Sequence, residues 1–413
     1  MYFKAPRLPP ALSPRIGCGF KKTSMNILYH FRTQGTGAEG VHIAGVARAM
    51  EALGHRVTFS SPTGIDPRTS AGANPFAARK RGLLARLAAR LPGVLFELLE
   101  LAYNVPAFFR NGRLLSRTEA GLLYERHAFF LCSTALLARW RGVPLVVEVN
   151  ELVGDERVRP DPWLSFLARI SDRLTFRLAT LVVVVSPHLQ RRIVALGVAK
   201  ERVLVLPNAV AEESLDVPAD GAAVRARLGL GDAVVVGFVG WFVPWHRLGN
   251  LVAQFAALAP AHPALRLVLL GDGTLREALA EQARQLRVEV IFPGAVAHEE
   301  VPAYLAAMDI AVVPHSNAYR SPIKLFEFMA RACAVLAPRV EPVEMVIRHE
   351  ENGLLFDPES PTDLRAQLAR LANDPALRAR LGKQAAADVR ERHTWRRNAE
   401  AVFANVRHLN SEL

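Results

Sequence analysis

Short apolar runs alternate with longer amphipathic stretches along most of this 413-residue chain. The first five runs are predicted strands, at Asn26–Tyr29, Arg56–Ser60, Leu145–Val149, Leu181–Val185 and Val203–Leu206. Strands that are buried on both faces read as continuous β-branched and leucine-rich runs, and their alternation with helices is typical of parallel sheets. The pattern therefore predicts an α/β domain with helices on both faces of a parallel sheet.

A second series of strands follows a stretch rich in Asp, Pro and Gly. It comprises Val234–Val239, Arg266–Leu270, Val288–Phe292, Ile310–Pro314 and Ala334–Ala337. The chain is too long for one ordinary core, so we expect two Rossmann-like, doubly wound domains, residues 25–206 and 221–392, joined by a hinge at 207–220. Residues 393–413 are predicted to form a C-terminal helix that packs back on the N-terminal domain. Ligands bind beyond the carboxyl ends of parallel strands, so the site is expected in a cleft between the domains.

Two segments depart from the alternation. Residues 1–24 are proline-rich and without periodicity, so we expect them to be disordered or to precede the native start at Met25. Residues 76–123 are predicted to form a basic helical insertion, because Phe76–Arg90 places arginines and leucines at helical spacing. Such a helix either caps the N-terminal core or contacts an anionic membrane surface.

The positive charge of the chain belongs to its N-terminal half. Residues 1–210 hold 29 Lys and Arg against 14 Asp and Glu; subtraction from the totals of 51 and 39 leaves 22 against 25 for the remainder. A basic half can meet nucleic acid, anionic lipid or a phosphorylated small molecule, or it can be a solvated surface. We expect no nucleic-acid partner. The sequence contains no run of about 18 uncharged apolar residues, so no transmembrane helix is predicted.

Cysteine usage argues against two kinds of site. Cys18, Cys132 and Cys333 are scattered without metal-ligand spacing, so neither a disulfide framework nor a zinc site is predicted. A reducing compartment is expected, which places the protein in the cytoplasm or at the inner face of the cell membrane.

The segment Ser321-Pro322-Ile323-Lys324-Leu325-Phe326-Glu327 carries the clearest candidate chemistry. Ser321 is predicted to cap a helix, and Pro322 suits its first turn, so Lys324 and Glu327 lie near its start on one face. The lysine and exposed backbone amides can bind a diphosphate, and the carboxylate can accept hydrogen bonds from two ribose hydroxyls. The alternative is a surface Lys–Glu pair of little energy.

A glycine-rich turn, Gly271-Asp272-Gly273, follows the predicted strand Arg266–Leu270. Backbone amides in such a turn can receive negative charge at the start of a helix. The same sequence is also suited to a simple hairpin or helix cap, so its weight depends on the segments around it.

The order and spacing of several segments resemble the retaining family-4 glycosyltransferases of the GT-B fold. The resemblance extends from Met25 over nearly the whole chain and is carried by the Gly-Asp-Gly turn and by Gly37–His42, Val182–Ser186, Val205–Asn208 and Lys324–Glu327. It implies transfer of a sugar, with retention, from a UDP- or GDP-sugar donor to a glycan or lipid-linked acceptor. No prosthetic group is implied.

The donor site implied by the resemblance departs from the family pattern at two places. Glu327 matches the second of two glutamates, which binds the donor ribose, whereas Tyr319 occupies the position of the first. Arg247 matches a phosphate-binding lysine, but Trp241 replaces a phosphate-binding arginine. We expect Lys324 to supply the missing cation. The remaining candidate donor contacts are Gly37, Gly40, Gly240, His246, Gly271, Gly273, Ser321, Pro322 and Ile323.

The N-terminal domain contributes two further candidates. Pro144–Asn150 resembles a strand that ends in a histidine near the transferred sugar, and Asn150 stands at that position. His127 is either an active-site group or a structural histidine. The expected catalytic set is Arg247, Lys324, Glu327, Asn150 and His127. Because the chain has no Asp-x-Asp triplet of the kind that holds a divalent ion on a diphosphate, we expect no metal.

Two other classes of enzyme and one class of binding protein are alternatives. An NAD-dependent oxidoreductase would place an acidic residue after the second strand, where Ser60-Ser61 stands. A sugar-nucleotide epimerase would require carboxylates facing the sugar, and Tyr319 and Asn150 supply none. A nucleotide-sugar-binding protein without transferase activity is the remaining alternative.

Overall fold

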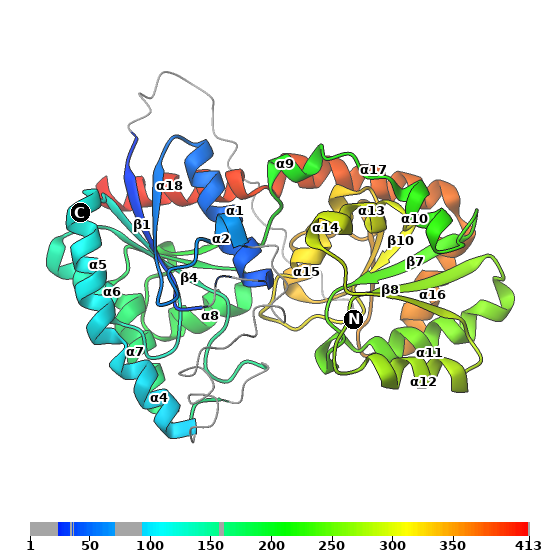
Figure 1. Cartoon of the computed structure of the whole chain (residues 1–413), viewed down its shortest axis with the longest axis horizontal. Helices are drawn as coiled ribbons and strands as arrows, with labels where there is room; N and C mark the ends of the chain where they lie inside the picture. The colour runs from blue at the N-terminus through cyan, green and yellow to red at the C-terminus, as the bar shows by residue number, and fades with distance from the viewer. Residues whose placement is uncertain (1–23, 34, 36, 71–92, 157–160, 412–413) are drawn as a thin grey trace, which may run out of the picture.

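The computed structural model describes residues 24–33, 35, 37–70, 93–156 and 161–411. Two α/β domains lie next to each other along the long axis of the molecule (Figure 1). Most of the predicted disordered start and the whole basic stretch Phe76–Arg90 lie outside the described residues. Among those that are described, no helix is long and apolar enough to cross a bilayer.

The N-terminal sheet has six parallel strands in the order β2-β1-β3-β4-β5-β6. Its strands are β1 (Asn26–His30), β2 (Arg56–Ser60), β3 (Leu122–Arg126), β4 (Leu145–Val149), β5 (Leu181–Val184) and β6 (Val203–Val205). β3 lies at the centre of the sheet but was not predicted as a strand, because it ends in Glu125 and Arg126 and its apolar run is short. The expected insertion at 76–123 therefore overlaps a regular strand.

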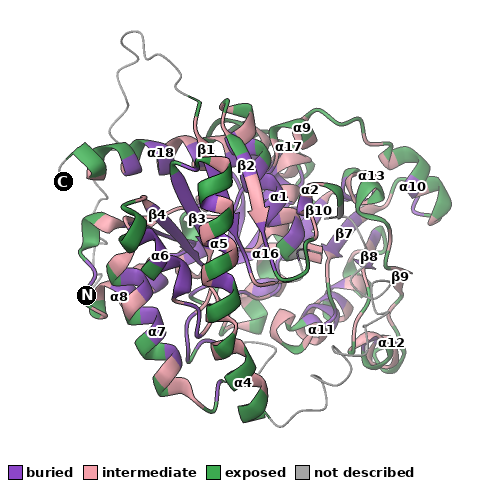
Figure 2. Cartoon of the chain, turned by 60° about the vertical axis from the view of Figure 1, so that its left-hand side comes forward, coloured by how far each residue is buried: buried purple, intermediate pink, exposed green. Residues whose placement is uncertain are grey.

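Helices cover both faces of this sheet, and their outer sides face solvent (Figure 2). One face packs against α1 (Gly37–Ala52) and α18 (Trp395–Ser411). The other packs against α5 (Asn104–Thr118), α6 (Ser133–Arg141), α7 (Ser165–Leu178) and α8 (Pro187–Ala195). The C-terminal helix α18 therefore completes the core of the N-terminal domain. Two further helices, α2 (Pro67–Ser70) and α4 (Gly93–Ala102), lie outside these layers.

The C-terminal sheet also has six parallel strands, in the order β12-β11-β10-β7-β8-β9. Its strands are β7 (Val234–Val239), β8 (Leu265–Leu270), β9 (Val290–Gly294), β10 (Ile310–Val312), β11 (Ala334–Pro338) and β12 (Leu354–Phe356). β12 has three residues and was not predicted, because so short an apolar run has no periodicity.

The helices of the C-terminal domain form two layers around its sheet. One layer consists of α11 (Leu248–Leu258), α12 (Arg276–Gln285) and α16 (Pro361–Asn373). The other contains α14 (Ile323–Ala330), α17 (Pro375–Arg392), α13 (Val301–Ala306) and α15 (Glu341–Glu344). The short elements are α9 (Glu212–Leu215), α10 (Gly221–Arg227) and the 3₁₀ helices η1 (Lys200–Arg202), η2 (Pro244–His246), η3 (Ala259–Ala261) and η4 (His298–Glu300).

The chain crosses between the domains at two adjacent points. The N–H of Val210 donates to the carbonyl oxygen of His393 (3.0 Å), and the N–H of Trp395 donates to the carbonyl oxygen of Val210 (2.9 Å). The amide of Asn398 donates to the carbonyl oxygen of Pro207 (2.8 Å). The chain therefore passes between the domains twice, once at the predicted hinge, 207–220, and once between α17 and α18.

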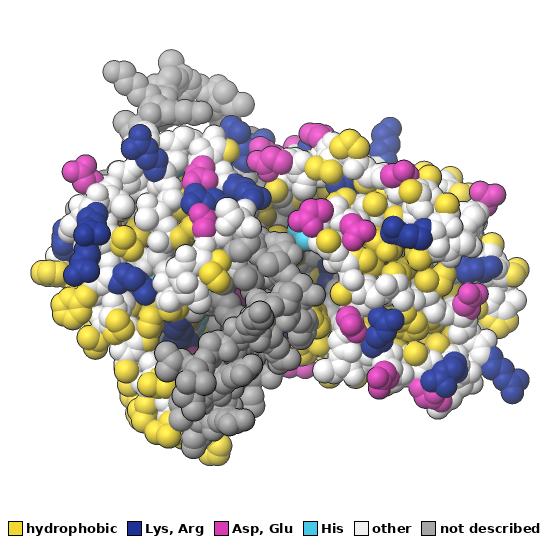
Figure 3. Space-filling view, in the orientation of Figure 1, with side chains coloured by type: hydrophobic (Ala, Val, Ile, Leu, Met, Phe, Trp, Pro, Cys, Tyr) yellow, Lys and Arg dark blue, Asp and Glu magenta, His cyan; other side chains and the backbone are white. Residues whose placement is uncertain are grey.

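The outer surface of the N-terminal domain is unusually apolar in one region. Hydrophobic side chains gather where α4 lies (Figure 3). Leu95, Leu98 and Leu99 of α4 are exposed, as is Trp163 beside it.

We predict that Gly382→Ala destabilises the C-terminal domain. A Cβ at Gly382 in α17 would lie 1.9 Å from the carbonyl oxygen of Ala332, so helix and backbone must separate. Overpacking of this kind costs about 1–3 kcal/mol. Gly112→Ala in α5 is the matched control, since its added Cβ meets Leu137 at an ordinary 3.6 Å and alanine favours a helix. Equal unfolding midpoints in urea for the two variants would contradict the prediction.

Candidate functional site

A cavity of about 730 Å³ lies between the domains, at the carboxyl ends of both sheets. The N-terminal domain lines it with residues that follow β1, β3 and β4, among them Arg32, His127 and Asn150. The C-terminal domain lines it with residues after β7 and β10 and with the start of α14. Both sheets therefore direct their strand ends at one cavity, as expected for doubly wound domains.

Lys324 is the cation that the start of α14 presents to this cavity. Its Nζ lies 3.2 Å from Nε2 of His246 and 4.1 Å from the ring centroid of Phe238. Burial lowers the pKa of Lys324 to about 7. Burial, and then the charge of Lys324, lower the pKa of His246 far below its usual range. His246 is therefore neutral and accepts a hydrogen bond from the lysine, and a bound anion would favour the ammonium form.

The prediction that Ser321 caps α14 is wrong. The residue before the helix is Pro322, in an extended conformation, and it makes no side-chain cap. The hydroxyl of Ser321 instead accepts a hydrogen bond from the N–H of Asn208 (2.9 Å), and the side-chain amide of Asn208 donates to the carbonyl oxygen of Ser321 (2.5 Å). Ser321 therefore ties the start of α14 to the hinge. Ser321, Pro322 and Ile323 all line the cavity.

Glu327 lines a second cavity, of about 540 Å³, instead of the first. Ile323 belongs to the walls of both cavities, so they adjoin each other along α14. Burial raises the pKa of Glu327. The other walls of the second cavity include His298 and, from the N-terminal domain, Arg48. Lys324 and Glu327 thus line two neighbouring cavities from one helix.

Arg247 does not line either cavity. Its side chain is 48% exposed and lies 3.9 Å from the carboxylate of Glu359. Its backbone is left-handed, with φ of 48°, between η2 and α11. The structure does not bring this candidate into contact with Lys324.

The candidate glycines of the C-terminal domain allow two loops to pack closely. A Cβ at Gly271 would lie 2.0 Å from the carbonyl oxygen of Gly240, and one at Gly273 would lie 2.6 Å from the backbone of Phe242. Gly240 in turn lies against Lys324, whose Nζ would be 2.8 Å from an added Cβ. The glycines therefore bring the loop after β7 against the lysine without forming cavity walls themselves.

The candidate glycines of the N-terminal domain begin α1. Gly37 is its first residue, with φ of 63°, and Gly40 is buried in its first turn. Neither lines the cavity. Glu39 and His42 of the same helix do. The glycines thus let the start of α1 reach the cleft.

Asn150 belongs to a buried cluster around Glu148. Oε1 of Glu148 lies 2.6 Å from Nε2 of His42, 2.7 Å from Nη1 of Arg126 and 2.9 Å from Nδ2 of Asn150. Burial alone would raise the pKa of Glu148, but His42 and Arg126 hold it far below its usual range. An ionised carboxylate only accepts hydrogen bonds, so the amide nitrogen of Asn150 must face it. The amide oxygen of Asn150 then remains to accept a hydrogen bond from a ligand.

His127 is fixed by a carboxylate. Its Nε2 lies 2.8 Å from Oδ1 of Asp172, and its ring packs on Phe129 and Phe176. It also lines the cavity. The structural and the site interpretations of His127 are therefore compatible.

Several residues that line the cavity were not predicted as site residues. They are Arg32, His42, Arg126, Trp245, His315, Asn317 and Arg320. His315 and Asn317 follow the end of β10, so the rule that sites lie beyond strand ends would have found them. Trp245 and Arg320 depend on the tertiary structure: the guanidinium lies 5.3 Å from a ring centroid of the tryptophan.

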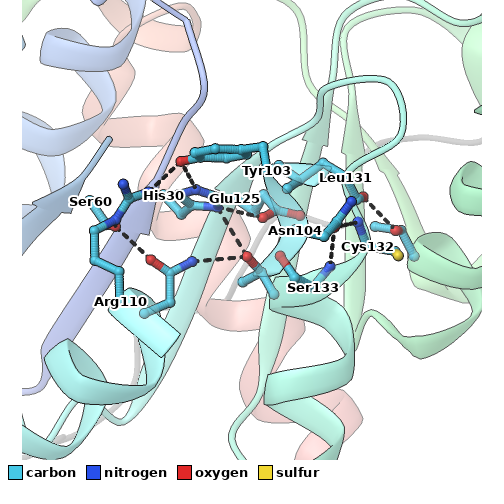
Figure 4. Close-up of polar contacts among 12 residues, drawn as sticks. His30, Ser60, Tyr103, Asn104, Arg110, Glu125, Leu131, Cys132 and Ser133 are labelled. Atoms are coloured by element: carbon cyan, nitrogen blue, oxygen red, sulfur yellow. Dashed lines mark hydrogen bonds and ion pairs between the residues drawn. The ribbon is translucent and has the colours of Figure 1, made fainter. Parts of the chain in front are cut away.

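A buried polar network supports the N-terminal wall of the cavity (Figure 4). Nδ1 of His30 lies 2.7 Å from Oε2 of Glu125, and Nε2 lies 3.3 Å from the hydroxyl of Tyr103. Arg110 donates to that hydroxyl and to Oγ of Ser60 (3.0 Å). The network joins β1, β2 and β3 to α5. It lies close to the ends of β1 and β3, and the residues that follow these strands line the cavity.

Nothing in the described part of the chain forms a metal centre: no group of three or more His, Cys, Asp or Glu is placed to hold an ion.

Two Rossmann-like domains that face each other across a cleft define the GT-B fold, and solved structures share it. The predicted fold is confirmed. The Anabaena protein HepE in complex with UDP superposes with a TM-score of 0.66 at 19% identity, over 94% of this chain and 100% of that chain.

Family models match each domain separately. Residues 37–209 match the model described as Glycosyl transferase 4-like domain, and residues 223–388 match Glycosyl transferases group 1. A D-inositol 3-phosphate glycosyltransferase from Thermomonospora curvata is 28% identical over 383 residues, 84% of this chain and 86% of that protein. The enzyme of the same name from Acidothermus cellulolyticus is 31% identical over 224 residues, 51% of this chain. That alignment spans about half of the relative, 49% of its length.

We predict that the affinity for UDP falls as the pH rises above neutrality. Lys324 loses its proton above a pKa of about 7 in the ligand-free protein, and a bound diphosphate raises that pKa. Affinity should fall by up to about tenfold per pH unit between about pH 7 and pH 8.5, with uptake of a proton. Calorimetry in buffers of different ionisation enthalpy measures both.

Two variants test this assignment. Lys324→Arg keeps its charge over the same range, so its binding should not depend on pH. Lys324→Met should bind UDP weakly and unfold at a higher temperature than the wild type at neutral pH, because the cost of burying an ammonium is removed. A wild-type affinity that does not change between about pH 7 and pH 8.5 would show that Lys324 is not the phosphate ligand.

We also predict that Glu148→Gln destabilises the N-terminal domain by about 3 kcal/mol, because it leaves Arg126 buried without its carboxylate. Urea denaturation measures the effect. Glu119→Gln, at an exposed position beyond α5, is the control and should change stability by less than about 0.5 kcal/mol. Equal stabilities of the two variants would mean that the cluster is not an ion-pair network.

Proposed function

We propose that this protein transfers a sugar, with retention, from a nucleoside diphosphate donor to a hydroxyl of a glycan or lipid-linked acceptor. The donor is a UDP- or GDP-sugar. The reaction takes place in the cytoplasm or at the inner face of the cell membrane, and it needs no metal ion.

The observation that carries this proposal is the placement of Lys324 and Glu327 on α14. The lysine faces one cavity and the glutamate faces the adjoining one, with Ile323 in both walls. A nucleoside diphosphate has the matching order of groups: its phosphates would meet Lys324 and the first amides of α14, and its ribose would meet Glu327. The transferred sugar would then extend into the larger cavity toward Asn150.

Charge stabilisation is the main contribution that we assign to the protein. As the bond between sugar and phosphate breaks, negative charge grows on the diphosphate, and Lys324 becomes a better partner for it. His246 accepts a hydrogen bond from Lys324 and holds its ammonium toward the cavity. In the retaining route, the acceptor hydroxyl approaches the face from which the phosphate leaves, and a phosphate oxygen takes its proton. The protein positions the partners, and no side chain has to act as a base.

The N-terminal wall would hold the sugar and the acceptor. Glu148 fixes the amide of Asn150, so its oxygen can accept from a sugar hydroxyl. Asp172 orients His127 in the same wall. Because Tyr319 occupies the place of the first family glutamate and is buried, the recognition of sugar hydroxyls would depend on other groups, such as Asn317 and Arg320.

We predict that Glu327→Ala weakens nucleotide binding by about 10–100-fold, since it removes a charged hydrogen-bond acceptor for the ribose. Thermal unfolding with UDP, GDP and their sugar conjugates measures binding, and one nucleotide should stabilise the wild type equally with and without EDTA. Glu277→Ala, on the exposed face of α12, is the control and should bind as the wild type does.

Three outcomes would contradict parts of this proposal. If no nucleotide stabilises the wild type, the donor site is wrong. If stabilisation disappears in EDTA, a metal ion takes part. If nucleotide sugars bind but no transfer or donor hydrolysis is detected with glycan and lipid acceptors, the protein is a nucleotide-sugar-binding protein. The anomeric configuration of the product, measured by NMR, tests retention.

A further inference from the structure

The outer faces of three adjacent helices in the N-terminal domain carry large apolar side chains. On each helix these residues are four positions apart, and therefore on one face: Val105 and Phe109 on α5, Leu136 and Trp140 on α6, Phe166 and Ile170 on α7. Single exposed hydrophobic residues are ordinary, but a patch that extends over neighbouring helices marks an interaction surface.

The patch is continuous from helix to helix. α6 packs against both α5 and α7. The ring of Phe108 stacks on that of Trp140 at 5.9 Å between centroids and meets Phe109 at 5.8 Å. Trp140 and Phe109 are nevertheless 70% and 69% exposed. Phe108 thus links α5 to α6, while the rings of Trp140 and Phe109 remain largely in solvent.

Within the described helices α5, α6 and α7, exposed arginines accompany this patch and no exposed carboxylate does. Seven exposed arginines lie on the three helices, namely Arg113, Arg117, Arg139, Arg141, Arg169, Arg173 and Arg177. The same helices contain one acidic residue, Asp172, which is buried against His127. The outer faces of these three helices therefore combine apolar side chains with positive charge.

The patch reaches the cavity through α4. Glu97 of α4 accepts hydrogen bonds from the N–H groups of Trp163 and Leu164 (2.8 Å each), which join α4 to the start of α7. Trp163 is 78% exposed, and Leu95, Leu98 and Leu99 of α4 are exposed as well. Hydrophobic side chains gather around α4 in Figure 3. One turn further along α4, Glu100 lines the cavity and pairs with Arg32 (3.0 Å). The apolar surface thus ends at the N-terminal wall of the site.

We propose that the outer faces of α4, α5, α6 and α7 form a docking surface for an anionic lipid bilayer. Tryptophan and phenylalanine are suited to the boundary between headgroups and acyl chains, and arginines attract anionic headgroups. A second copy of this chain is a poorer partner, because a symmetric contact through this face would bring arginines against arginines. The surface places the cavity next to the membrane, where a lipid-linked acceptor would be presented. Its existence does not depend on the transfer reaction.

Vesicle cosedimentation without nucleotide tests this surface. The wild type should bind vesicles of phosphatidylcholine with phosphatidylglycerol, bind those of phosphatidylcholine alone weakly, and dissociate as salt is raised. A variant with Phe109→Ser, Trp140→Ser and Phe166→Ser should lose at least about tenfold in affinity, and so should one with Arg139→Gln, Arg169→Gln and Arg173→Gln. A variant with Leu286→Ser and Met345→Ser, at exposed apolar positions of the C-terminal domain, is the control.

All variants should keep the UDP affinity of the wild type, which shows that they are folded and separates this test from that of the donor site. The proposal is overturned if the wild type does not bind anionic vesicles, or if the patch variants bind them as the control does. It is also overturned if the wild type forms dimers in sedimentation velocity and the aromatic variant is monomeric, since the face would then join two copies.

Discussion

The site depends on one energetic conflict: Lys324 keeps an amine in a place that disfavours its charge. Burial lowers its pKa to about 7, and its hydrogen-bond partner His246 is itself held neutral. The ligand-free protein therefore bears a cost that a bound diphosphate removes. Gly240 leaves room for the amine of Lys324, because a side chain at Gly240 would displace it. Gly271 in turn lets its loop pack against the backbone of Gly240. Relief of this cost therefore contributes to the free energy of binding.

On the opposite wall of the cavity, a buried charge is balanced by neighbouring charged groups. Glu148 is ionised because His42 and Arg126 compensate for its burial, and it holds the amide of Asn150 so that the amide oxygen can face a ligand. The C-terminal wall therefore offers an amine whose charged form a bound anion would favour, and the N-terminal wall offers Asn150 together with charged groups that are already paired, such as Arg32 and Arg126. Such a division suits a substrate with a diphosphate at one end and a sugar at the other. The bond between Ser321 and Asn208 links the first wall to the hinge, so movement of the domains also moves the start of α14.

The helices of the N-terminal domain have two different faces. Their inner faces complete the core with the sheet, and the network of His30, Glu125 and Tyr103 fixes α5 to the strands that carry the cavity wall. Their outer faces present apolar side chains and arginines. Because the same helices connect the two surfaces, a partner bound outside is held at a set distance from the cavity. Seven of the basic residues in the first half of the chain lie on the outer faces of α5, α6 and α7.

The sequence by itself determined the two parallel sheets and the helix of Lys324 and Glu327, because hydrophobic periodicity and strand-to-helix order are local properties. It missed β3 and β12, whose short apolar runs become strands only when neighbouring strands supply hydrogen bonds. Only the tertiary structure decided that Ser321 bonds to the hinge, that Arg247 lies outside the cavity, and that Glu148 joins His42 and Arg126. These facts depend on residues far apart in the chain, and their burial sets the charges that local spacing cannot predict.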